Sequence, residues 1–235
     1  MKKLRIVCSN IKSQSAKLLA AALSDDLQYH VFRGRHRYTN RANLIYGDQR
    51  DKLTQYKFFT ENKLNFPAYT ESKVVADGWM KDNKCSIVCR TLLRSRSGKG
   101  IVIADTVEQL VNAPVYVTYQ KKTNEYRILL FKGEVVCIRE KRLKIGYEKP
   151  EGREGRVRSH DNGYVFCEPL DDLPEEAVSM AKAAAIITSS DFVGIDIAFH
   201  KPTGYWFMLE VNSAPGMEGK TIVQYKDAII NYFKE

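Results

Sequence analysis

The 235-residue sequence contains no apolar run of membrane-spanning length, no internal repeat and no low-complexity segment. A membrane-spanning helix needs about 20 mostly apolar residues in a row. The start, Met1-Lys2-Lys3, resembles that of a signal peptide, but the apolar stretch from Leu4 to Cys8 is too short to complete one. We therefore predict a cytoplasmic protein that has no membrane partner.

Cysteines are few and are not spaced for pairing or for zinc. The five cysteines are odd in number, and the sequence has no C-x-x-C pattern. Cys85 and Cys89 lie four residues apart in an apparent strand, which is a poor zinc arrangement. We predict that all five are reduced thiols, as in cytosolic proteins.

Acidic residues are outnumbered, since 28 of them face 37 basic residues and the formal charge is +9. This balance favours acidic partners, which include nucleotides, acidic peptides and nucleic acids. The hydrophobic content of 44% is enough for a core in one domain or two packed lobes. The densest basic run is interpreted either as a solvated loop or as a docking surface for an acidic substrate; it comprises Arg33, Arg35, His36, Arg37 and Arg41.

Two alternating apolar runs near the end of the chain predict a β-hairpin around Pro202-Thr203-Gly204, with Gly204 at positive φ. The alternation places two apolar sets on one face, namely Val193, Ile195, Ile197 and Phe199 in the first run and Tyr205, Phe207, Leu209 and Val211 in the second. If residue 201 pairs with residue 205, Asp196 lies opposite Glu210. Asn212, Trp206 and Met208 would then share the face of these two carboxylates.

Two carboxylates and an amide oxygen on one face suit a hard cation. Mg²⁺ takes a few such oxygens and completes its shell with water and phosphate. Asp196, Glu210 and Asn212 therefore predict a magnesium site that a polyphosphate completes. The alternative is the solvated face of an edge hairpin, because polar residues commonly face water in antiparallel sheets.

Asp196, the hairpin, Leu209-Glu210-Val211-Asn212 and Pro215-Gly216-Met217 resemble the C-terminal signature of ATP-grasp carboxylate–amine ligases. The resemblance extends back to about Arg50. Gly194-Ile195-Asp196 is more similar to RimK-type glutamate ligases than to D-alanine–D-alanine ligases, which usually have Arg at the position of Gly194. It implies that the Asp, Glu and Asn hold one or two Mg²⁺ ions on ATP, with Mn²⁺ as an alternative.

The implied fold is an α+β and α/β architecture of the glutathione synthetase type, in compact form. A short N-terminal α/β unit, 1–48, would come first. Two α+β subdomains, 49–113 and 114–235, would follow it and clamp ATP between them. For that unit the pattern predicts strands at 4–8, 29–32 and 43–46. It also predicts a helix that Ser13 or Ser15 caps, with an apolar face of Ala16, Leu19, Ala20 and Leu23.

A second helix is predicted at 50–62, opened by Asp51-Lys52-Leu53. The resemblance implies that a lysine of this helix approaches the nucleotide phosphates. Lys57 is the first candidate and Lys52 the second. The alternative for either residue is an ordinary surface lysine.

Strands at 86–90 and 101–104 flank a small basic loop, 93–100, which includes Gly98, Lys99 and Gly100. Backbone N–H groups and Lys in such a loop suit a flap over phosphates, although a mobile turn is the alternative. The loop lacks the P-loop spacing. The family usually has a Lys for the α-phosphate where Arg90 ends the first strand, and Arg keeps that charge.

A short helix is predicted at 107–111 and a strand at 114–119. The resemblance implies that the backbone of Tyr116, Val117 and Thr118 meets the adenine. A hairpin at 125–131 and 134–138 follows around Lys132-Gly133. The resemblance places Arg127 near the transferred phosphate together with Lys141, for which Arg139 and Arg142 are alternatives.

Residues 144–163 have the composition of a long loop, which we interpret as a substrate-facing lid with His160 at the surface. Pro174-Glu175-Glu176 is typical of a helix start, because Pro and acidic residues suit the first turn. An amphipathic helix at 221–233 closes the chain.

The implied function is ATP-dependent ligation of a carboxylate substrate to an amine acceptor through an acyl phosphate. An acidic peptide or a protein terminus as acceptor is a hypothesis. An ATP-grasp kinase would share the nucleotide site. A basic protein that binds nucleic acid without catalysis would explain the charge and the Tyr/Arg interleaving at 29–41, but not Glu210-Val211-Asn212. The sequence makes no prediction of oligomeric state.

Overall fold

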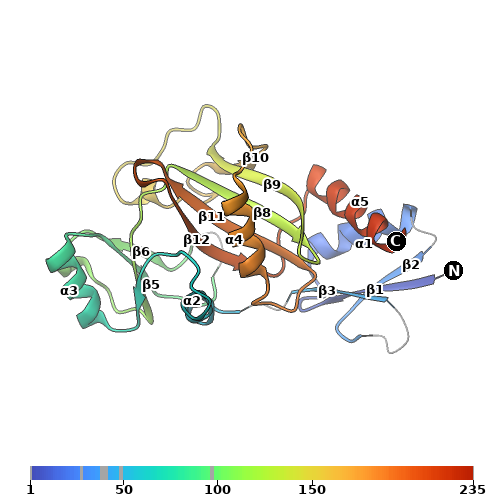
Figure 1. Cartoon of the computed structure of the whole chain (residues 1–235), viewed down its shortest axis with the longest axis horizontal. Helices are drawn as coiled ribbons and strands as arrows, with labels where there is room; N and C mark the ends of the chain where they lie inside the picture. The colour runs from blue at the N-terminus through green and yellow to red at the C-terminus, as the bar shows by residue number, and fades with distance from the viewer. Residues whose placement is uncertain (1, 27–28, 38–41, 48–49, 96–97, 235) are drawn as a thin grey trace.

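The computed structural model describes residues 2–26, 29–37, 42–47, 50–95 and 98–234. Three sheets follow one another along the molecule, with the N-terminal unit at one end and the small lobe at the other (Figure 1). The large sheet lies between them, and both of the other units pack against it. Among the described helices, none is both long enough and apolar enough to cross a membrane.

The N-terminal unit is a parallel three-stranded sheet in the order β2-β1-β3, covered by helix α1. Its elements are β1 Lys2–Cys8, α1 Gln14–Asp26, β2 Tyr29–Gly34 and β3 Ala42–Tyr46. The Ser13 hydroxyl accepts the Ala16 N–H at 3.3 Å, and the four predicted apolar residues of α1 are buried. The predicted unit is therefore confirmed in its elements. Arg35, His36 and Arg37 of the basic run are exposed, and Arg41 lies outside the described residues.

Helix α5 Lys220–Lys234, predicted at 221–233, returns from the end of the chain to pack beside α1 (Figure 1). Its Tyr225 and Ile229 are buried in the same core as β1, β3 and α1. The N-terminal unit is also tied to the segment that follows the predicted metal hairpin. The Tyr46 hydroxyl donates to the Pro215 carbonyl at 2.6 Å, so this unit fixes the loop at one edge of the candidate site.

The small lobe is an antiparallel four-stranded sheet in the order β4-β7-β5-β6, flanked by two helices. Its elements are α2 Lys52–Glu61, β4 Tyr69–Thr70, α3 Lys73–Asn83, β5 Ile87–Arg90, β6 Ile101–Ala104 and β7 Val115–Thr118. The helix predicted at 107–111 is a single 3₁₀ turn, Val107–Gln109. Helix α3, which was not predicted, is capped by the Ser72 hydroxyl and buries Ala76 and Met80. Strand β7, assigned by the prediction to the large lobe, pairs within this sheet.

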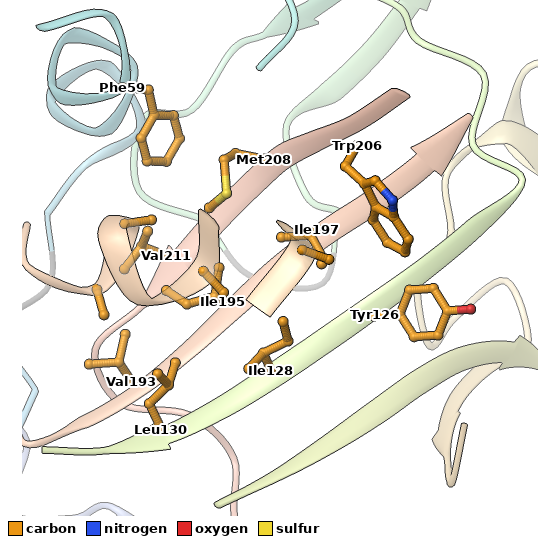
Figure 2. Packing of buried hydrophobic residues seen from close by; sticks show 14 of the residues in the cluster. Phe59, Tyr126, Ile128, Leu130, Val193, Ile195, Ile197, Trp206, Met208 and Val211 are labelled. Atoms are coloured by element: carbon orange, nitrogen blue, oxygen red, sulfur yellow. The ribbon is translucent and has the colours of Figure 1, made fainter. Parts of the chain in front are cut away.

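The large sheet is antiparallel in the order β10-β9-β8-β11-β12. Its strands are β8 Asn124–Phe131, β9 Glu134–Leu143, β10 Tyr164–Cys167, β11 Phe192–His200 and β12 Tyr205–Asn212. Helix α4 Glu175–Ala185 begins directly after Pro174, as predicted. Its alanines pack on one face of the large sheet. That face also receives Phe59 of α2 (Figure 2). The opposite face is apolar where Leu129, Phe131 and Phe192 pack in one core with the N-terminal unit and α5. Elsewhere that face carries polar side chains.

The predicted hairpin forms, and Asp196 does pair with Glu210, but its register changes at a bulge. Close to the turn His200 pairs with Tyr205, and the register shifts between Asp196 and Ile197. A bulge of one residue reverses which side chains share a face. The prediction for Trp206 and Met208 was therefore wrong: both side chains lie in the apolar core with Val211 (Figure 2).

The turn of this hairpin and the close packing behind Asp196 both involve glycine. Gly204 follows the 3₁₀ turn Lys201–Thr203 and has a φ of 65°, as predicted. Gly194 pairs with Asn212, and a Cβ added to it would lie 3.1 Å from the Cβ of Pro215. A side chain such as the Arg of D-alanine–D-alanine ligases would therefore require the Pro215 loop to move.

Strand β12 is an edge strand of the large sheet, and a side chain of α2 satisfies its free edge. The Gln55 amide accepts the Val211 N–H at 2.9 Å and donates to the Val211 carbonyl at 3.0 Å. Gln55 is only 3% exposed. One side chain thereby mimics a neighbouring strand and holds α2 beside Glu210.

We expect Gln55→Leu to lower the free energy of unfolding by about 2–3 kcal/mol, because it leaves two buried backbone groups of Val211 without partners. Urea denaturation measures this loss. Lys57→Leu, on the exposed side of the same helix, is the control and should change stability by less than about 0.5 kcal/mol. Equal stability of the two variants would show that the Gln55 contact contributes nothing.

Candidate functional site

A cavity of about 650 Å³ lies between the small-lobe sheet and the polar face of the large sheet. Most of the site residues predicted from the sequence line this cavity. Those that line it are Arg90, Gly98, Val117, Thr118, Arg127, Lys141, Asp196, Glu210 and Asn212. Those outside its lining are Lys57, Lys99, Gly100 and Tyr116.

The two carboxylates of the predicted metal site lie side by side on neighbouring strands, and each has a cationic partner. Asp196 is 5% exposed and accepts two hydrogen bonds from Arg127, at 2.6 Å from Nε and 2.7 Å from Nη2. Glu210 forms an ion pair with the Lys52 ammonium. Like charges placed directly opposite on adjacent strands repel, and buried charges need counter-charges. Lys52 and Arg127 supply these counter-charges, one to each carboxylate.

Burial and charge act in opposite directions on these two cations. Desolvation lowers the pKa of Lys52, and the attraction of Glu210 only partly offsets it. Desolvation also disfavours charge on Arg127, but the ion pair and hydrogen bonds with Asp196 outweigh it and raise the pKa of the guanidinium. Arg127 therefore remains a permanent positive charge in the cavity.

The donor set fits a magnesium ion that shares its shell with phosphate. The described residues contain no cluster of three or more His, Cys, Asp or Glu side chains suited to a metal. The candidate set is instead two carboxylates and an amide. Asn212 Nδ2 is buried and has no hydrogen-bond partner among the described residues, so this N–H donor suits a phosphate oxygen rather than the cation. An incomplete cage of hard oxygen donors is what Mg²⁺ on a nucleotide requires.

Of the two lysine candidates on α2, the second, Lys52, lines the cavity and the first, Lys57, does not. Lys57 is exposed and pairs with Glu71 at 3.2 Å, outside the cavity. Lys52 is 4% exposed and lines the cavity. The physical reason is the helix period: Lys52 shares the buried face of Gln55, Tyr56 and Phe59, whereas Lys57 is rotated away from it.

Arg90 and one glycine of the predicted flap reach the cavity. The Arg90 guanidinium lies 5.8 Å from the centroid of the Tyr56 ring, and its buried Nε has no partner among the described residues. Gly98 lines the cavity, but Lys99 is exposed and not part of the lining. The Gly100 carbonyl accepts the Thr91 N–H at 2.8 Å, which closes the base of the loop. Lys99 and Gly100 thus lie outside the lining of the cavity.

Strand β7 presents two of its three predicted residues to the cavity. Val117 and Thr118 line it, and Tyr119 and Gln120 continue the wall. Tyr116 faces the other way, where its hydroxyl donates to the Val111 carbonyl at 3.2 Å. Tyr116 is therefore part of the small-lobe core.

Among the three cations proposed for β9, Lys141 alone lines the cavity. Its ammonium donates to Glu125 at 2.6 Å. Arg142 donates to the Glu168 carbonyl at 2.7 Å, outside the cavity lining. Arg139 is directed toward α5, where it donates to Gln224 at 2.5 Å.

Glu125 and Lys122 are cavity residues that the sequence reasoning missed. Glu125 is 3% exposed and pairs with both Lys122, at 2.8 Å, and Lys141. Desolvation by itself would raise the pKa of Glu125, but the two ammonium groups outweigh it and lower the pKa to about 2. Alternation from Arg127 along β8 places Glu125 on the same face, and this was the signal available in the sequence.

The depressed pKa of Glu125 predicts acid sensitivity. Its ion pairs stabilise the fold above the ordinary pKa of 4.5, and this contribution disappears as the pH falls to about 2. We expect Glu125→Gln to lower the free energy of unfolding at pH 7 by on the order of 3 kcal/mol. The difference from the unmodified chain should shrink between about pH 4.5 and pH 2. Denaturation curves across that pH range test this, and a difference that is independent of pH would contradict it.

The long loop 144–163 reaches from the large lobe to the small lobe, and this placement supports its interpretation as a lid. Arg156, Val157 and Arg158 line the cavity. Arg156 forms an ion pair with Asp105, the residue after β6. Hydrogen bonds from Arg156 and Ser86 lower the pKa of Asp105. His160 is exposed, in agreement with the prediction of a surface histidine.

No protein-family model matches the chain. A probable alpha-L-glutamate ligase of Thioalkalivibrio sulfidiphilus (strain HL-EbGR7) is 25% identical over 186 residues, which are 72% of this chain and 57% of that protein. The chain thus spans less than two thirds of that relative.

Solved structures of ATP-grasp ligases resemble the whole chain. The ATP-grasp ligase PsnB, complexed with a minimal precursor, matches with a TM-score of 0.67 and 13% identity, covering 98% of this chain and 99% of that one. The Chryseobacterium gregarium RiPP-associated ATP-grasp ligase, in complex with ADP and a leader and core peptide, has a TM-score of 0.66 and 11% identity, covering 100% and 98%. The chain therefore has the ATP-grasp fold that its hairpin motif predicted, and it is similar in sequence to probable alpha-L-glutamate ligases.

Proposed function

We propose that the protein is an ATP-dependent ligase that joins a carboxylate to an amine through an acyl phosphate. The observation that carries this proposal is the row of Glu210, Asp196 and Arg127, in register on adjacent strands of one cavity wall. It brings the two candidate metal ligands next to a permanent cation. The similarity to probable alpha-L-glutamate ligases supports the same reaction class.

Charge neutralisation is the main task of such a site, since phosphoryl transfer needs little covalent help from a protein. Asp196, Glu210 and Asn212 would hold Mg²⁺, which would offset negative charge on the nucleotide phosphates. Arg90 and Lys52 would bind phosphate oxygens, while β7 and the residues after it would border the base. Lys141 and Arg127 would face the transferred group. Loop 144–163 would exclude water from it.

The proposed reaction has two steps. A carboxylate oxygen of the substrate attacks the γ-phosphorus of ATP, and ADP leaves. The amine then attacks the acyl carbon, an amide forms, and phosphate leaves with release of one proton. Exclusion of water protects the acyl phosphate between the steps.

The acceptor in this proposal is an acidic peptide or protein, which the basic surface of the chain would attract. PsnB and the Chryseobacterium gregarium ligase are described in complex with a precursor and with peptides, respectively. Saturation of the ligation rate by free amino acids at micromolar concentration would contradict this part of the proposal.

Trapping with hydroxylamine tests the proposed chemistry. Mg-ATP, a pool of carboxylates and hydroxylamine should yield a hydroxamate, because hydroxylamine replaces the amine in the second step. The hydroxamate identifies the carboxylate by mass. ADP formation with a stable phosphorylated alcohol as product would instead establish a kinase. ADP formation without hydroxamate from any carboxylate would contradict a ligase.

A further inference from the structure

The main cavity carries more positive than negative charge. Among the described residues that line it, seven are Lys or Arg and four are Asp or Glu, which leaves an excess of three positive charges. Buried charges need counter-charges. A triphosphate would therefore balance the cavity, whereas a divalent cation by itself would add to the excess.

The two candidate metal ligands are already paired with cations of the same cavity. Both carboxylate oxygens of Asp196 accept hydrogen bonds from Arg127, at 2.6 Å and 2.7 Å. Glu210 forms its ion pair with the ammonium of Lys52. A metal ion that binds these oxygens meets both positive charges at close range, so Lys52 and Arg127 compete with it for the carboxylates.

The pair of Lys52 and Glu210 is the one that can exchange. Glu210 has a side chain that is 27% exposed, whereas the side chain of Asp196 is 8% exposed and is held by two hydrogen bonds from neighbouring β8. The ammonium of a lysine is a point charge on a flexible stem, whereas the planar guanidinium of Arg127 has a fixed geometry. Lys52 can therefore transfer from Glu210 to another anion while Arg127 stays in place.

The backbone around Lys52 places its ammonium between the metal ligands and the flap loop 93–100. The Lys52 N–H donates to the carbonyl of Leu93, at the start of that loop, at 3.1 Å. On the other side, Gln55 of the same helix is bound to Val211, the residue after Glu210. One lysine thus reaches both Glu210 and the space below the flap, where the phosphates are proposed to bind.

We propose that Lys52 is an internal counter-ion that keeps Glu210 from binding a divalent cation until a nucleotide enters. Phosphate oxygens then take over Lys52, and Glu210 becomes available to the metal. Metal and nucleotide consequently bind with positive coupling, which is reciprocal between the two ligands. This inference rests on the proposed function, which places both ligands in this cavity, and it adds a binding order: nucleotide first, metal second.

Titration with Mn²⁺ alone tests the competition, with the free ion followed by electron paramagnetic resonance. The unmodified chain should bind Mn²⁺ weakly. Lys52→Met removes the competing charge, so it should bind Mn²⁺ at least about 10-fold more tightly. Damage to the fold does not produce such a gain.

A non-hydrolysable ATP analogue in the presence of EDTA tests the second half of the proposal. Lys52 then serves the phosphates, so Lys52→Met should weaken binding of the analogue at least about 10-fold. The same substitution thus shifts the affinities for metal and for nucleotide in opposite directions. Two controls should match the unmodified chain in both titrations: Lys52→Arg, which keeps the charge, and Lys57→Met, on the exposed side of α2.

Thermal unfolding of the unmodified chain tests the binding order without any variant. The analogue with EDTA should raise the unfolding temperature, and Mn²⁺ alone should not. Equal Mn²⁺ affinity of Lys52→Met and the unmodified chain would overturn the inference, as would stabilisation of the unmodified chain by Mn²⁺ alone. Failure of the proposed function has a different signature: hydroxamate would not form from any acid, while the opposite shifts caused by Lys52→Met would remain.

Discussion

Replacement of Glu210 by Gln is expected to reduce ATP-dependent phosphate release by at least about 100-fold. Glu210 lies opposite Asp196 in the cavity wall, and the neutral amide removes half of the carboxylate charge that the site offers to a metal. The shape of the side chain is preserved, so the loss reports on charge. Steady-state phosphate release at saturating Mg²⁺ and ATP measures it.

The matched control is Glu134→Gln, because this carboxylate is 82% exposed and pairs with Lys182 far from the cavity. It should retain full activity. Partial rescue of Glu210→Gln by raised metal concentration would further support metal binding. Activity of Glu210→Gln within about threefold of the unmodified chain would exclude Glu210 as a metal ligand.

Lys52→Met should have a comparably large effect, and on two properties. It removes a buried cation that faces the phosphates in our proposal, so kcat/KM for ATP should fall about 100-fold. It also leaves Glu210 without its counter-charge, which should cost about 2–3 kcal/mol of stability in the absence of metal. Activity assays and thermal unfolding measure the two effects separately.

Lys57→Met separates this prediction from a general effect of removing charge from α2. Lys57 lies on the same helix, but it is exposed and outside the cavity. It should retain activity within about twofold and should unfold at an unchanged temperature. If Lys57→Met lost activity and Lys52→Met did not, the assignment made from burial would be wrong.

Sequence alone predicted most strands, the helices α1, α2, α4 and α5, and the pairing of Asp196 with Glu210. These features depend on local patterns, which are the alternation of strands and the period of helices. The choice between Lys52 and Lys57 was also available from such a pattern. Tyr56 and Phe59 mark the buried face of α2, and Lys52 falls on that face.

The bulge in β12 had no comparable signal. The sequence Trp206-Phe207-Met208-Leu209 is apolar at every position, so alternation does not state which residues face the core. The tertiary packing on α4 decides it, and Trp206 and Met208 enter that core. Helix α3 was missed for another reason: its face is small, with Ala76 and Met80 as its buried residues.

The partners of the charged residues depend on contacts between distant segments. Glu125 lies 16 residues before Lys141, and the antiparallel register of β8 and β9 brings them together. Arg139 meets Gln224 of α5 across 85 residues of sequence. The sequence alone lists these cations, but only the fold shows that Lys141 lines the cavity and that Arg139 is directed toward α5.

Measurement of ADP, phosphate and amide in one reaction tests the central claim most directly. Mg-ATP is supplied with a carboxylate pool, an amine pool, both or neither, and products are quantified by mass spectrometry. We expect equal amounts of ADP, phosphate and amide when both pools are present, and at least about 100-fold less of each product in Glu210→Gln. Phosphate release that is independent of the amine, or amide formation that is independent of ATP, would contradict it.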